Sequence, residues 1–112
     1  MSDVKVTAMN VTIPNKASDA VAASAFAASD NVYIPCDKKH TKVIITPTAA
    51  GNIVFKAGDS FIATNDLTIA ATASKDFAID LDSSSFEITQ GTNKGNILMI
   101  PAVAGSIRVV RG

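Results

Sequence analysis

Short apolar runs, each ended by a turn signal, organise the central part of this chain. They lie at residues 43–46, 53–56, 67–70 and 77–81. The stretches between them hold proline, glycine or small polar residues, which favour turns. Runs that recur every ~8–12 residues are typical of the strands of an antiparallel sandwich or barrel. The pattern therefore predicts an all-β domain.

Two of these runs also predict which side chains face inward. In residues 77–82 the apolar side chains alternate with Ala78, Asp80 and Asp82, so that one face of the strand is apolar. Residues 43–45 are instead three apolar residues in a row, so both faces of that strand are expected to be partly covered. Such a strand belongs in the middle of a small sandwich or at a subunit contact.

The flanking sequence adds further strands and one ambiguous segment. Short strands are expected at residues 31–35, 86–88, 97–100 and 106–111, and residues 48–52 are expected to close a hairpin between the strands on either side. Residues 16–30 are rich in alanine and serine, which predicts either a short helix near 19–28 or a loop.

The N-terminal residues 1–14 form an extended run that ends at Pro14. They are expected either to be an edge strand of their own domain or to be an arm that pairs with a neighbouring copy. Both possibilities stay open at the level of the sequence.

These elements predict a single domain over residues 1–112. Its fold class is an all-β, antiparallel β-sandwich of the jelly-roll type, with about eight to ten short strands and at most one short helix near 19–28. The predicted core comprises Val43, Ile45, Phe55, Leu67, Ile69, Phe77, Ile79, Phe86, Ile97, Met99, Ile107 and Val109.

Composition narrows the classes of function. Lysine plus arginine and aspartate plus glutamate each total 10, so the net charge is zero and nothing favours binding to nucleic acid. The single cysteine, Cys36, excludes a disulfide within the chain. No apolar run reaches the ~20 residues that a membrane helix needs, and the start resembles no secretory signal. We therefore expect a protein made in a cytoplasm, with no membrane partner.

Candidate chemistry is sparse. His40 is the one histidine and lies in a polar turn, where it is expected to be a solvated side chain, and Cys36 is expected to be an inert thiol. Asp80 and Asp82 share a strand face, with Asp76 and Glu87 nearby in sequence, and paired acids can serve glycoside hydrolysis or calcium binding.

The glycine and glutamate pattern of a calcium loop is missing around these acids, so they are interpreted as an ordinary acidic strand face. Gly51, Gly58 and Gly95 form no phosphate-binding motif. We expect no catalytic, cofactor-binding or metal site, and no enzymatic activity.

The order of the strand and turn segments resembles that of small virion proteins of tailed phages and prophages. The segments are KVIIT at 42–46, IVFKAGD at 53–59, DLTIAA at 66–71, the stretch 77–88 that ends in DLDSSSFEI, the glycine-bearing loop at 91–95 and the basic last strand at 107–111.

This resemblance implies a capsid decoration or cement protein: a β-sandwich domain, often a trimer, that sits on the assembled head and stiffens it. The implied partner is the major capsid protein, and the implied location is the virion, assembled in the host cytoplasm. The alternative is a tail-associated or carbohydrate- or receptor-binding β-sandwich module.

Overall fold

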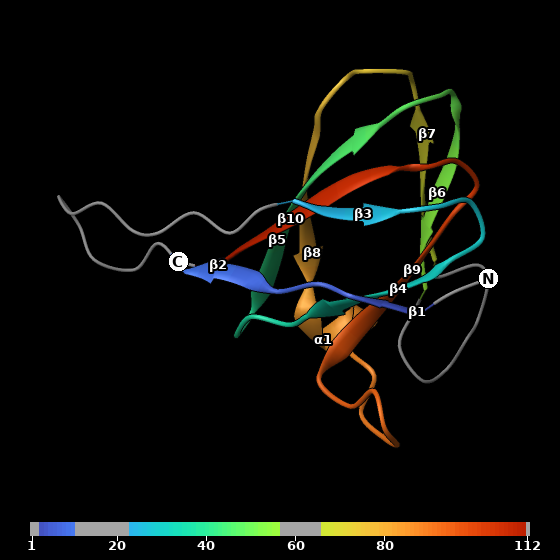
Figure 1. The fold of residues 1–112 in the computed structure, drawn as a ribbon. Helices are drawn as coiled ribbons and strands as arrows, with labels where there is room; N and C mark the ends of the chain where they lie inside the picture. The colour runs from blue at the N-terminus through green and yellow to red at the C-terminus, as the bar shows by residue number, and fades with distance from the viewer. Residues whose placement is uncertain (1–2, 11–22, 57–65, 112) are drawn as a thin grey trace, which may run out of the picture.

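The structure, a computed structural model, describes residues 3–10, 23–56 and 66–111, which form ten strands in two packed sheets (Figure 1). Sheet A contains, in spatial order, β1 (Asp3–Lys5), β4 (Asn31–Pro35), β9 (Asn96–Pro101), β6 (Gly51–Phe55) and β7 (Leu67–Ala71). Sheet B contains β2 (Ala8–Asn10), β10 (Gly105–Arg111), β5 (His40–Pro47) and β8 (Phe77–Asp82), and β3 (Ser24–Phe26) also pairs with β10. The predicted fold class, an all-β sandwich, is confirmed.

The chain changes sheet at most of its connections. β4 lies in sheet A, β5 in sheet B, β6 and β7 in sheet A, β8 in sheet B, β9 in sheet A and β10 in sheet B. Among the described strands, β6 and β7 are the sequential neighbours that pair with each other in one sheet. Each layer is therefore built from strands that are distant in sequence.

The predicted hairpin through residues 48–52 is wrong, because β5 and β6 lie in different sheets. Pro47 ends β5, and the amide of Thr48 donates to the carbonyl of Ala104 at 3.0 Å, next to the last pair of the β5–β10 ladder, before the chain crosses to sheet A at Gly51. Gly51 then passes close to Val103: a Cβ on this glycine would lie 2.5 Å from Cγ1 of that valine. A residue without a side chain lets the first residue of β6 lie against the connection between β9 and β10.

The N-terminal segment 3–10 spans both sheets. β1 pairs in parallel with β4 in sheet A, and β2 pairs in parallel with β10 in sheet B. Between them Val6 is buried and its amide donates to the carbonyl of Tyr33 at 3.1 Å. The expected single extended run is thus divided into two short strands. Within this chain the segment is an edge strand, whereas its use as an arm on a neighbouring copy stays a prediction.

The helix expected near residues 19–28 is wrong for the part that the structure describes, since Ser24–Phe26 is strand β3. Phe26 is buried against the core there, which outweighs the helix propensity of the neighbouring alanines. Residues 19–22 lie outside the described residues.

A single helical turn, α1 (Ser83–Phe86), stands where a turn and the start of a strand at 86–88 were expected. The carboxylate of Asp82 accepts from the amide of Ser84 at 3.0 Å and caps this turn. The amide of Glu87 donates to the carbonyl of Ser83 at 2.9 Å, so it closes the turn instead of joining a sheet. This expected strand at residues 86–88 is therefore wrong.

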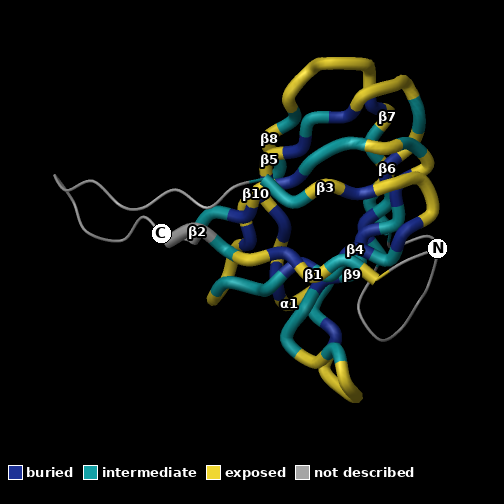
Figure 2. Tube along the Cα trace, viewed as in Figure 1, coloured by how far each residue is buried: buried dark blue, intermediate teal, exposed yellow. Residues whose placement is uncertain are grey.

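The core lies between the two sheets (Figure 2). The predicted core residues of the inner strands are buried, and these are Val43, Ile45, Phe55, Ile97, Met99, Ile107 and Val109. Those on the edge strands and on α1 are only partly buried, and these are Leu67, Ile69, Phe77, Ile79 and Phe86. Buried residues absent from the prediction include Val6, Phe26, Val32, Ile34, Ile53 and Leu81. An edge strand has a neighbour on one side only, so most of its inward side chains are covered less completely, although Leu81 of β8 is 1% exposed.

One polar pair is enclosed in this apolar interior. The hydroxyls of Thr41 and Ser83 lie 2.8 Å apart and are hydrogen-bonded, and both residues are at most 1% exposed. Thr41 Oγ1 also accepts from the amide of Asp37 at 3.1 Å, and the amide of Ser83 donates to the carbonyl of Lys39 at 3.0 Å. These bonds join β5, the β4–β5 connection and the first residue of α1.

Candidate functional site: the outer face of sheet B

The side chains that point outward from β5, β8 and β10 form one surface, which we call the sheet B face. Its residues are His40, Lys42, Ile44 and Thr46 from β5, Ala78, Asp80 and Asp82 from β8, and Ser106, Arg108 and Val110 from β10. In the strand register Ile44 lies between Arg108 and Ala78, and Lys42 lies between Val110 and Asp80. Alternate residues of a strand point to the same side, so this set follows directly from the register.

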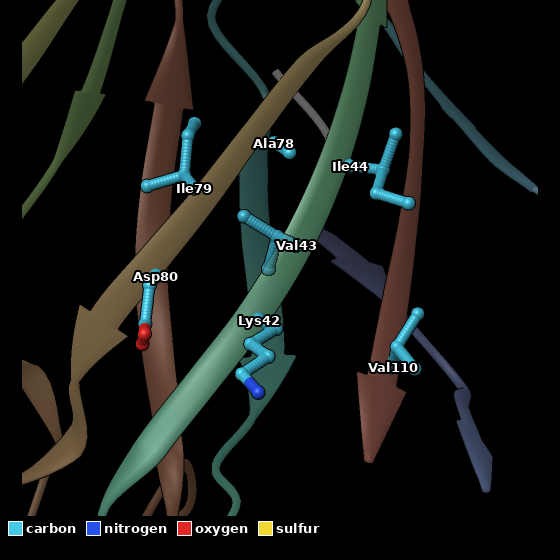
Figure 3. A pocket seen from close by; sticks show the side chains of 7 residues that line it. All are labelled: Lys42, Val43, Ile44, Ala78, Ile79, Asp80 and Val110. Atoms are coloured by element: carbon cyan, nitrogen blue, oxygen red, sulfur yellow. The ribbon is translucent and has the colours of Figure 1, made fainter. Parts of the chain in front are cut away.

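The centre of the sheet B face is apolar. Ile44 is 37% exposed and is the one large hydrophobic side chain classed as exposed among the described residues. Beside it lies a shallow hollow of about 340 Å³, lined on the outer face by Ile44, Ala78, Val110, Lys42 and Asp80 and completed by Val43 and Ile79 of the same strands (Figure 3). Three strands therefore contribute to one apolar depression, and its two charged lining residues, Lys42 and Asp80, lie opposite each other in the register of β5 and β8.

The acidic groups around this hollow are engaged within the protein. Asp80 Oδ1 lies 3.1 Å from Nδ1 of His40, with both side chains more than half exposed. At the other end of the face, Asp76 Oδ1 accepts from the hydroxyl of Thr46 at 2.7 Å. Each of these two carboxylates thus has a partner on β5.

Asp82, the third acid, is bound by serine residues of α1. Its carboxylate accepts from the hydroxyl of Ser84 at 2.7 Å and from that of Ser85 at 3.2 Å. The hydrogen bonds from the side chain and the backbone of Ser84 lower the pKa of Asp82 below its usual value of 3.8. Asp82 therefore stays ionised as the cap of the helical turn.

The two basic groups near the centre of the face differ from the acids. In the described part of the chain Lys56 forms an ion pair with Asp66, and His40 contacts Asp80, which is an ion pair only when the imidazole is protonated. Lys42 and Arg108 take part in neither, and both are exposed on the sheet B face. The face therefore carries two cations and the two carboxylates of Asp80 and Asp82, with Asp76 at its edge, and these carboxylates are hydrogen-bonded to His40, to serine groups of α1 and to Thr46.

A second, smaller hollow of about 120 Å³ adjoins the first on the other side of Ile44. Its lining is more polar: Thr46, Asp76, Ser106 and Arg108, with Ala23, Ile44 and Ile107. Hydroxyl, carboxylate and guanidinium groups converge here, which are the groups that hydrogen-bond polar ligands.

The candidates chosen from the sequence are placed as follows. His40 is on the rim of the sheet B face with a 60% exposed side chain, as expected of a solvated histidine. Cys36 is half-buried just after β4 and packs against the core. Asp80 and Asp82 do share the outer face of β8, and Glu87 lies at the C-terminal end of α1.

Within the described ranges, no group of three or more histidine, cysteine, aspartate or glutamate residues is arranged to hold a metal ion. No helix in the described ranges has the length and apolar character to cross a membrane. The feature of this candidate surface that the sequence did not indicate is the proximity of Arg108 to Lys42 and Ile44. The three consecutive apolar residues at 43–45 indicated a contact surface, but only the pairing of β5 with β10 brings Arg108 to it.

Comparison of the chain with protein-family models, with curated proteins and with solved structures gave no match.

Proposed function

We propose that this protein is a phage structural protein of the capsid decoration or cement type, which binds the assembled head and stabilises it. The observation that carries the proposal is the sheet B face, with its exposed apolar centre, its charged rim and its position on the flat side of a sandwich. An apolar centre inside a polar rim is the usual anatomy of a protein–protein interface. The strand and turn segments that resemble small phage virion proteins supply the class of partner, the major capsid protein.

A protein that binds an assembled head needs a rigid contact surface and does not need catalytic groups. The hollow lies on three adjacent strands whose inward side chains, among them Val43, Ile45, Ile107 and Val109, are almost fully buried, so the surface is held by the core beneath it. Copies bound at symmetric positions of a head add many modest contacts into a strong total effect. The proposal includes a trimer as the unit bound, with the virion as its location.

The test uses heads assembled from the major capsid protein encoded in the same genome, purified without this protein. The expected results are saturable co-sedimentation of the protein with the heads and a higher temperature of head disruption when it is bound. Light scattering of the isolated protein is expected to give the mass of a trimer. If the protein stays in the supernatant at high micromolar concentration, the decoration role is refuted, and a monomer mass at that concentration refutes the trimer.

A second candidate function is a tail-associated module that binds a carbohydrate or receptor. The polar hollow formed by Thr46, Asp76, Ser106 and Arg108 favours it, because sugar hydroxyls are recognised by convergent polar groups. Glycan binding that is lost in Asp76→Ala or Asp80→Ala, together with no binding to heads, would favour this function over decoration. A neighbouring major capsid gene supports decoration, and neighbouring tail or lysis genes support the module.

A further inference from the structure

We draw no further inference here: the strongest candidate, the edge of sheet A at β7 (Leu67–Ala71), which pairs with β6 alone among the described strands and has no charged residue, supports no proposal because nothing in the described ranges shows what covers it.

Discussion

The hydrogen bond between the buried hydroxyls of Thr41 and Ser83 is expected to make a measurable contribution to the stability of the fold. Thr41→Val preserves the shape of the side chain but removes the oxygen that bonds to the hydroxyl of Ser83 at 2.8 Å and accepts from the amide of Asp37 at 3.1 Å. Leaving a buried polar group without a partner costs about 1–3 kcal/mol. Ser83 is 1% exposed and has no access to water, whereas Asp37 is half-exposed and can bind solvent.

We therefore expect Thr41→Val to lower the free energy of unfolding by about 2 kcal/mol, mostly from the stranded hydroxyl of Ser83. For a domain of this size that corresponds to a melting temperature lower by about 8 °C. Ser83→Ala is expected to cost about 1 kcal/mol, because Thr41 keeps its bond from the amide of Asp37. The double variant is expected to lose less than the two single losses combined, by about 1 kcal/mol, since the second substitution removes the group that the first had left unpaired.

The assay is urea unfolding followed by far-ultraviolet circular dichroism for the four proteins of this cycle, with the slope of the transition compared among them. An unchanged slope assigns the differences to stability and not to altered compactness. A loss of less than about 0.5 kcal/mol in Thr41→Val, which is the range of an ordinary surface substitution, would refute the reasoning. So would additive losses in the double variant, because they would mean that the two hydroxyls do not depend on each other.

Two further predictions concern a glycine and the capping carboxylate. Gly105→Ala is expected to lower the melting temperature, measured by differential scanning calorimetry, much more than Gly91→Ala. A Cβ at Gly105 would lie 2.6 Å from the carbonyl oxygen of Thr46, whereas a Cβ at Gly91 meets nothing within 4 Å and adds only the strain of a positive φ. Equal losses in the two variants would contradict the close packing at Gly105. Asp82 has a pKa that is lowered in the folded state, so the stability that it adds is present above its unfolded pKa of about 3.8 and is lost as pH falls through the lower folded value. Asp82→Ala should therefore be less stable than the unaltered protein at neutral pH, and this difference should vanish in acid; a difference that persisted unchanged in acid would count against this cap.

The sequence predicted those parts of the fold that depend on local alternation. In β8 the apolar side chains at every second position place Asp80 and Asp82 outward, and the structure has them so. The three apolar residues at 43–45 predicted a central strand with both faces partly covered, and β5 lies between β10 and β8 with Ile44 on the outer face. In both cases the period of two is enough to separate inside from outside.

Pairing between distant strands could not be predicted in this way. Nothing local indicates that β5 and β6 lie in different sheets, or that residues 24–26 pair with β10, because both depend on which distant strand is available. The candidate site could likewise be predicted only in part. The apolar residues on either side of Ile44 indicated that it would face outward, but its position beside Arg108 depends on the register of β5 and β10. The helical turn at 83–86 was missed because Asp82 is both the last residue of β8 and the cap of this turn, and alternation reveals only the first of these roles.

The two parallel pairings of the N-terminal segment have a consequence for how the protein matures. Ala8 pairs with Val109, so a residue near the start of the chain can pair only after one near the opposite end has been synthesised. Contacts of such wide sequence separation slow folding, since a long loop must close before they form. During synthesis β1 can pair with β4 as soon as residues 31–35 are made, whereas β2 stays without its partner until β10, the last strand, is complete.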